Sequence, residues 1–220
     1  MTKKILMVVS NVSEINPETK TGVWFEEFAV PYLGFEHNDF EILVSSLKGG
    51  VAPVDADSYD CSSPTEWDTT KIHLDNTVML KDVKHEDYDA IVFPGGHAPM
   101  FDLAESDYLA DIVSYFYKTG RLVAAICHGP AALINARKEN GEPLVKGLRL
   151  TSFTNMEEHI VHKDELMPFM LQTKLVSLGA RFVEEKPWSE HVEVDDNLIT
   201  AQNQKSAYVF TDAIIDWFKK

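Results

Sequence analysis

The chain has 220 residues, of which 45% are hydrophobic, and its 20 basic and 35 acidic residues give a formal net charge of −15. This length and composition are typical of one large α/β domain with a sizeable core. The negative charge argues against binding to nucleic acid or to an anionic membrane, because both would repel it. No apolar run approaches the roughly 20 residues of a membrane span, and no cleavage pattern follows the N-terminal apolar run. We therefore expect a cytoplasmic protein.

Short apolar runs rich in β-branched residues alternate with longer segments of helical periodicity. This alternation is typical of a mostly parallel sheet with helices on both faces, which is a three-layer α/β sandwich. The runs predict strands at residues 4–10, 40–46, 89–94, 122–127, 148–153 and 197–201. The periodic segments predict helices at residues 22–35, 100–118, 164–178 and 206–219.

Residues 48–82 do not follow this alternation. The segment is rich in proline, glycine, aspartate and serine, with only scattered apolar residues, and we interpret it as an irregular insertion or lid beside a pocket. No internal repeat and no Gly/Ser linker separates folded units. We therefore expect residues 1–220 to form a single domain.

The two cysteines, Cys61 and Cys127, are too few for a disulfide framework and lack the paired spacing of a zinc site. Cys127 ends a predicted strand and is followed by His128 in the sequence ICHGP. A side chain on such a strand-to-helix turn lies at the carboxyl edge of the sheet, near helix amides that stabilise a thiolate. This position favours Cys127 as a nucleophile.

A buried core cysteine is the alternative interpretation of Cys127, because free cysteine is among the most buried residue types. Glycine and proline are poor continuations of a strand, however, and a histidine is costly at an apolar position. Cys61 lies in the turn-like sequence DCSSP, and we expect it to have no role in the chemistry.

Gly95 and Gly96 follow the predicted strand at residues 89–94, at the same edge of the sheet as Cys127. A glycine pair permits a tight turn whose amides can approach a ligand, as in a backbone oxyanion hole. The alternative is an ordinary loop between a strand and a helix.

Glu26 and Glu27 are adjacent in the predicted helix at residues 22–35, so at most one of them faces solvent comfortably. A carboxylic acid that points into an apolar site has a raised pKa and can act as a general acid or base. A solvated helix face is the alternative, and the residues alone do not decide which glutamate points inward.

His159 and His162 have a spacing that can bind a metal ion on a helix. Their charged neighbours indicate a hydrated surface instead. We expect no metal site there and no cofactor elsewhere.

Three motifs, TGVWFEEFAVP, FPGGHAPMFDL and AICHGP, occur in this order and resemble those of the ThiJ/PfpI (DJ-one-like) superfamily. The resemblance covers nearly the whole chain and implies the flavodoxin-like, class I glutamine amidotransferase-like fold. The insertion and the later sequence SFTNMEE are most similar to the heat-shock-protein-31-like branch. That branch contains glutathione-independent glyoxalase III enzymes and holding chaperones.

The resemblance implies a role for each candidate residue. The nucleophile falls on Cys127 and the catalytic histidine on His128, and the buried acid falls on Glu27 because the family has it four residues before a proline. The acid that orients the histidine falls on Glu158, with Glu157 as the less favoured choice. The amides of Gly96 and His128 would form the oxyanion hole, with Gly95 shaping the turn. One departure is Ala98-Pro99 after the GGH sequence, where the branch usually has glycine.

The implied activity is the conversion of methylglyoxal, a small 2-oxoaldehyde, to lactate without a cofactor. Two alternatives are a stress-response chaperone that holds unfolded clients and a hydrolase of the amidase, peptidase or deglycase type. Glutaminase activity is disfavoured, because the C-terminal sequence AIIDWFKK has no usable histidine and glutamate. Relatives of this kind are commonly homodimers.

Overall fold

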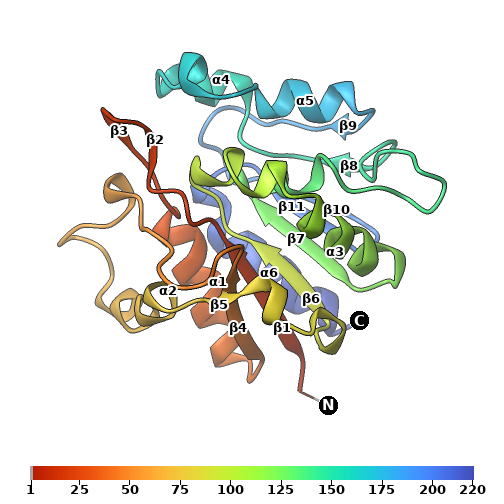
Figure 1. Cartoon of the computed structure of the whole chain (residues 1–220), viewed down its shortest axis with the longest axis horizontal. Helices are drawn as coiled ribbons and strands as arrows, with labels where there is room; N and C mark the ends of the chain where they lie inside the picture. Colours follow the sequence, from red (N-terminus) through yellow and green to blue (C-terminus); the bar gives the residue numbers. More distant parts are fainter. Residues whose placement is uncertain (1) are drawn as a thin grey trace.

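The computed structural model describes residues 2–220, so Met1 of the predicted domain lies outside the described residues. A seven-stranded sheet with the order β10-β11-β7-β6-β1-β4-β5 forms the centre (Figure 1). Neighbouring strands are parallel, except that β10 pairs antiparallel with β11. The strands are β1 (Lys4–Val9), β4 (Glu41–Ser46), β5 (Val78–Met79), β6 (Ala90–Phe93), β7 (Leu122–Ile126), β10 (Val192–Asp195) and β11 (Leu198–Ala201).

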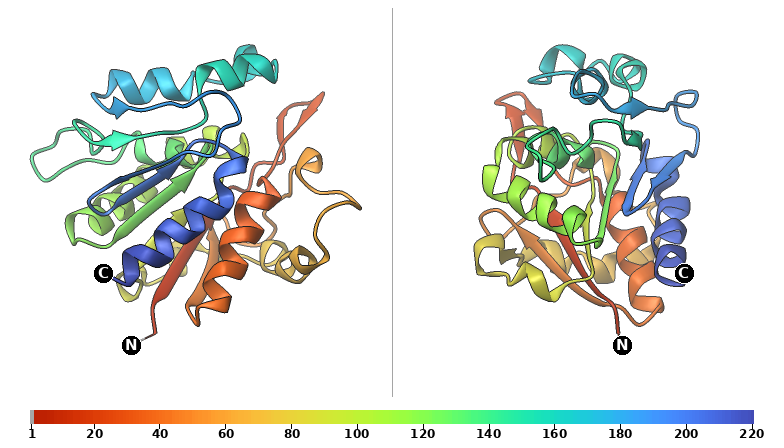
Figure 2. Two further views of the ribbon diagram at one scale, coloured as in Figure 1. Left: turned by 180° about the vertical axis from the view of Figure 1, so that it is seen from behind. Right: turned by 90° about the vertical axis from the view of Figure 1, so that its right-hand side faces the viewer.

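Helices cover both faces of this sheet. On one face, α1 (Phe25–His37) and α6 (Ala207–Phe218) pack side by side, as Figure 2 shows. The opposite face is covered by α3 (Asp107–Lys118). The central strands β6 and β7 are buried along their whole length, as expected of parallel strands between two helical layers. The predicted three-layer α/β sandwich with a mostly parallel sheet is therefore confirmed.

A smaller layer lies above the sheet in Figure 1. It contains α4 (Asn155–Ile160), α5 (Leu171–Ser177) and a two-stranded sheet of β8 (Arg149–Leu150) and β9 (Arg181–Phe182). The predicted strand at residues 148–153 was wrong in its extent and in its sheet, because only Arg149 and Leu150 form a strand and they pair with β9. The following residues cross the end of the central sheet, where the Phe153 amide donates to the carbonyl of Cys127.

Three predicted helices start later than their apolar patterns suggest. The segment before α1 stays extended because the Val23 amide donates to the Pro53 carbonyl. The predicted helix at residues 100–118 begins only at Asp107, where the Ser106 hydroxyl caps it by accepting from the Leu109 amide. The predicted helix at 164–178 reduces to α5, which follows Pro168, because proline disfavours the helical conformation at the residue before it.

Several short elements were not predicted. They include a hairpin of β2 (Glu14–Asn16) and β3 (Thr19–Lys20), the four-residue α2 (Ile72–Asp75), and the edge strands β5 and β10. Residues 48–82 contain α2, β5 and short 3₁₀ turns between irregular stretches. Among residues 2–220, every helix is too short or too polar to cross a bilayer.

Candidate active site

Cys127 directly follows β7 and has a left-handed backbone conformation, with φ of 60°. Its amide donates to the Ala201 carbonyl at 2.9 Å, and its carbonyl accepts from the Phe153 amide at 2.8 Å. These bonds hold a conformation that L residues rarely adopt. The turn also lies against β6, because a Cβ on Gly129 would come within 2.2 Å of the Phe93 carbonyl oxygen. The structure thus places the Cys127 side chain at the carboxyl edge of the sheet.

The helix that follows Cys127 is a five-residue 3₁₀ helix, Gly129–Leu133. The pKa of the Cys127 thiol lies well above its usual range. Burial is the main cause, and the charge and hydrogen bond of Glu27 add to it, whereas the Gly96 amide acts in the opposite direction. The expectation that helix amides lower this pKa is therefore wrong. In this buried setting the loss of solvation outweighs the attraction of a short helix.

Glu27 is the inward-facing glutamate of α1. It is fully buried, whereas Glu26 is partly exposed. The Gly95 amide donates to Glu27 Oε2 at 3.0 Å, and a Cβ on Gly95 would lie 2.6 Å from that oxygen and 2.8 Å from Cys127 Cβ. The absence of a side chain at Gly95 therefore leaves room for both the acid and the nucleophile. Burial raises the pKa of Glu27 to about 8, so the acid is largely protonated at neutral pH.

His128 connects Cys127 to Glu158. Its Nδ1 lies 3.4 Å from Cys127 Sγ, and its Nε2 lies 2.7 Å from Glu158 Oε2. Glu158 projects from the first turn of α4, which Thr154 caps by accepting from the Glu157 amide at 3.1 Å. Both His128 and Glu158 are buried. This order of sulfur, imidazole and carboxylate is suited to removing the thiol proton.

Glu157 is also buried but serves another purpose. Its carboxylate accepts from the amides of Thr154 and Trp188 and from the side chains of Gln202 and Asn203. These bonds join α4 to the segments that follow β9 and β11. Of the two adjacent glutamates, Glu158 is thus the one that contacts the imidazole.

The Gly96 amide lies close enough to the Cys127 sulfur to favour its anionic form. Within residues 2–220, neither the Gly96 nor the His128 amide donates to a backbone carbonyl. The Gly96 amide instead interacts with the Glu27 carboxylate and the Cys127 sulfur. Amides beside a nucleophile are the kind of donor that an oxyanion hole requires. Ala98 and Pro99 are buried in a short 3₁₀ turn after the glycine pair, so the departure from the family sequence lies beyond these amides.

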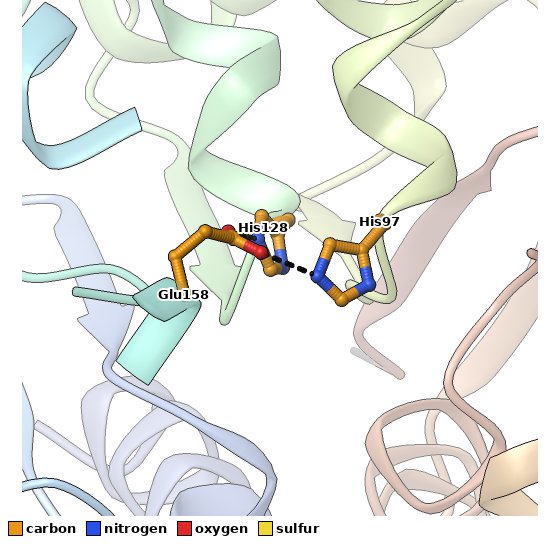
Figure 3. A group of neighbouring side chains, drawn as sticks. All are labelled: His97, His128 and Glu158. Atoms are coloured by element: carbon orange, nitrogen blue, oxygen red, sulfur yellow. Dashed lines mark hydrogen bonds and ion pairs between the residues drawn. The ribbon is translucent and has the colours of Figure 1, made fainter. Parts of the chain in front are cut away.

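His97 belongs to the same cluster, although the sequence analysis assigned it no role. Its Nε2 lies 2.8 Å from Glu158 Oε1, and Figure 3 shows both histidines beside the Glu158 carboxylate. The only available signal was its position directly after the glycine pair, which also places it at the carboxyl edge of the sheet.

His97, His128 and Glu158 are residues of the kinds that bind metal ions and lie close together. Two ligand atoms about 2.0 Å from a tetrahedral zinc ion lie roughly 3.3 Å apart. The nitrogen–oxygen distances here are 2.7 and 2.8 Å, which are hydrogen-bond lengths. The cluster therefore fits a hydrogen-bonded network better than a metal site.

Cys127, His97 and His128 line a pocket of about 200 Å³. Part of its wall is aromatic. The Phe153 ring packs in tilted geometry against the His128 ring, 4.6 Å away, and against the Trp188 ring, 5.7 Å away, measured between ring centroids. Such a pocket has room for a small molecule beside the sulfur.

Three residues singled out in the sequence, Cys61, His159 and His162, lie outside this cluster. Cys61 is exposed in the 48–82 segment. His159 is exposed and contacts Asp164 at 3.0 Å, and His162 is also exposed. The six other candidates, Glu27, Gly95, Gly96, Cys127, His128 and Glu158, are brought together by the fold.

Over its full length the chain is similar to Glyoxalase 3 of Candida albicans (29% identical, 98% of each chain) and to glutathione-independent glyoxalase HSP31 of Saccharomyces cerevisiae (27% identical, 99% of this chain and 98% of the relative). It superimposes on the crystal structure of glyoxalase III from Candida albicans with a TM-score of 0.88 at 27% identity, covering 97% of this chain and 96% of that one. Residues 21–217 match the model of the DJ-1/PfpI family. With the sequence motifs, the fold and the cysteine turn in agreement, the chain belongs to the DJ-1/PfpI family.

Proposed function

We propose that this protein is a glutathione-independent glyoxalase that converts methylglyoxal to lactate. The observation that carries the proposal is the contact series from Cys127 through His128 to Glu158, with Glu27 beside the sulfur. Relatives with glyoxalase names match nearly the whole chain, and their similarity supports the same activity.

The reaction starts with the thiol of Cys127. His128 accepts the thiol proton at Nδ1, and the sulfur then adds to the aldehyde carbon of methylglyoxal to form a hemithioacetal. The amides of Gly96 and His128 stabilise the oxygen anion that develops on that carbon.

The next steps move a proton and add water. A proton leaves the former aldehyde carbon and returns to the adjacent carbon through an enediol, carried by Glu27 and His128, and a thioester results. Water then cleaves the carbon–sulfur bond to give lactate and the free thiol. Glu27 suits this role because a pKa of about 8 lets it hold or release a proton near neutral pH.

The test is lactate formation from methylglyoxal without glutathione. We expect turnover by the wild type and none by Cys127→Ala, while Cys61→Ala serves as the matched control because that cysteine is exposed and outside the pocket. A wild-type protein without turnover would refute the proposal.

Two other activities would use the same chain differently. If the protein is a holding chaperone, the wild type and Cys127→Ala should suppress the aggregation of unfolded clients equally well. If it is a hydrolase, it should release peptide or amide products under conditions where no lactate forms. A cytoplasmic location and a homodimer stay predictions, which cell fractionation and light scattering can check.

A further inference from the structure

Glu158 accepts hydrogen bonds from two histidines, although orienting His128 requires only one. Each carboxylate oxygen has its own partner, His97 Nε2 at 2.8 Å and His128 Nε2 at 2.7 Å. The three side chains are at most 7% exposed, and the two imidazole rings lie 4.2 Å apart between centroids. Figure 3 shows the Glu158 side chain reaching both rings. His97 therefore belongs to the same buried network as His128.

The two bonds determine where the protons lie. Burial is the largest single influence on Glu158 and acts to raise its pKa. The charges and hydrogen bonds of His128 and His97 together outweigh burial, so the pKa of Glu158 lies well below its usual range. An ionised carboxylate only accepts hydrogen bonds, so both Nε2 atoms carry hydrogen. His128 Nδ1 faces the Cys127 sulfur, and in a neutral ring with hydrogen on Nε2 this nitrogen carries the free lone pair. This is the tautomer that accepts the thiol proton.

The other nitrogen of His97 gives a second, independent observation. His97 Nδ1 is buried without a hydrogen-bond partner in the described part of the chain. Burial, followed by the neighbouring His128, lowers the pKa of His97 to about 4, so the ring is neutral near pH 7. A buried acceptor without a partner destabilises the fold. The polar contact that favours a histidine here is therefore the one with Glu158.

We propose that His97 is a positioning residue for the glyoxalase reaction: its Nε2–H keeps Glu158 ionised and oriented, so that Glu158 keeps His128 in the proton-accepting tautomer. This inference rests on the proposed function and adds a residue to it. Without His97, Glu158 would bind a proton more readily, and its protonated carboxyl would donate a hydrogen bond to His128 Nε2. His128 would then carry its hydrogen on Nδ1, facing the sulfur, and could not accept the thiol proton.

Other charged groups surround this network. Lys163, which follows α4, lines the same pocket and acts on His97. Glu157 precedes Glu158 in α4, and Glu27 of α1 lies beside Cys127. All three remain in the variants described next, so their effects are common to the parent protein and the variants.

The experiment compares His97→Phe, which removes the donor but keeps a ring, with His97→Gln, which keeps an N–H group that can reach Glu158. Lactate formation is measured from pH 5 to 9. We expect His97→Phe to lower kcat at least about 10-fold at pH 6 with little change in KM. The acidic limb of its pH profile should move to higher pH, and His97→Gln should restore most of the loss. His159→Gln, at an exposed histidine, is the matched control.

A spectroscopic measurement keeps the test independent of activity. Nitrogen-15 NMR of the histidine side chains should show His128 with hydrogen on Nε2 in the wild type and an increased share on Nδ1 in His97→Phe. A folded His97→Phe with unchanged pH profile and unchanged His128 tautomer would overturn the inference. If the wild type forms no lactate, the proposed function fails, whereas the NMR comparison still decides the role of His97.

Discussion

The buried acid Glu27 allows a quantitative test through stability. Its pKa rises from 4.5 to about 8 on folding, so between these values the folded chain holds a proton that the unfolded chain has lost. The contribution of this proton to the free energy of unfolding is fully present below pH 4.5, and it falls as the pH rises toward 8. With 1.36 kcal/mol per pKa unit, the loss is about 1.4 kcal/mol at pH 5.5 and about 3.9 kcal/mol at pH 7.5.

Glu27→Gln removes this titration while keeping an oxygen that can accept from the Gly95 amide. Urea unfolding followed by tryptophan fluorescence should therefore show the variant gaining about 2.5 kcal/mol over the wild type between pH 5.5 and 7.5. The partly exposed neighbour provides the control, because Glu26→Gln should show a much smaller pH dependence. A constant difference between Glu27→Gln and wild type across this range would refute the reasoning.

Three further predictions concern the same site. Gly95→Ala should lower lactate formation at least about 100-fold and destabilise the fold by about 1–3 kcal/mol, because the new Cβ would lie 2.6 Å from Glu27 Oε2. A variant with wild-type kinetics would contradict this prediction. The kcat/KM for methylglyoxal should rise with pH through about 8 as the pair of Glu27 and Cys127 loses a proton, whereas a flat profile from pH 6 to 9 would argue against a shared proton. Glu157→Ala should lower the free energy of unfolding by about 3 kcal/mol or more, since several buried donors lose their acceptor; urea denaturation checks this.

The sequence predicted the central strands well because a parallel strand between two layers is a continuous apolar run. β6 and β7 are buried at every residue, and this burial is what their composition reflects. The edge strands β5 and β10 have two and four residues, too few for a periodic signal. The segment after Leu150 looked like another strand, but it crosses the end of the sheet instead. The Thr151 amide donates to the Thr200 hydroxyl of β11, and the Phe153 amide donates to the Cys127 carbonyl just after β7.

A site residue was predictable where a reactive side chain stands at a sequence position that the fold places at the carboxyl edge of the sheet. Cys127, on the turn after a predicted strand, is such a residue. The choice between Glu26 and Glu27 depended on how α1 packs against the glycine turn, which helical pitch alone leaves open. The raised pKa of Cys127 was not predictable, because it depends on burial and on an acid 100 positions earlier in the chain. His97 was missed since its significance comes from sharing Glu158 with His128.

The left-handed backbone of Cys127 implies a conflict between durability and reactivity at this position. A side chain in that conformation destabilises the folded state by about 1–2 kcal/mol relative to glycine, yet glycine has no sulfur. Selection for thermal resistance alone would therefore remove the nucleophile, and Cys127→Gly should melt at a higher temperature than Cys127→Ala. The presence of cysteine here means that the fold tolerates a local weakness for the sake of chemistry, as functional sites often do.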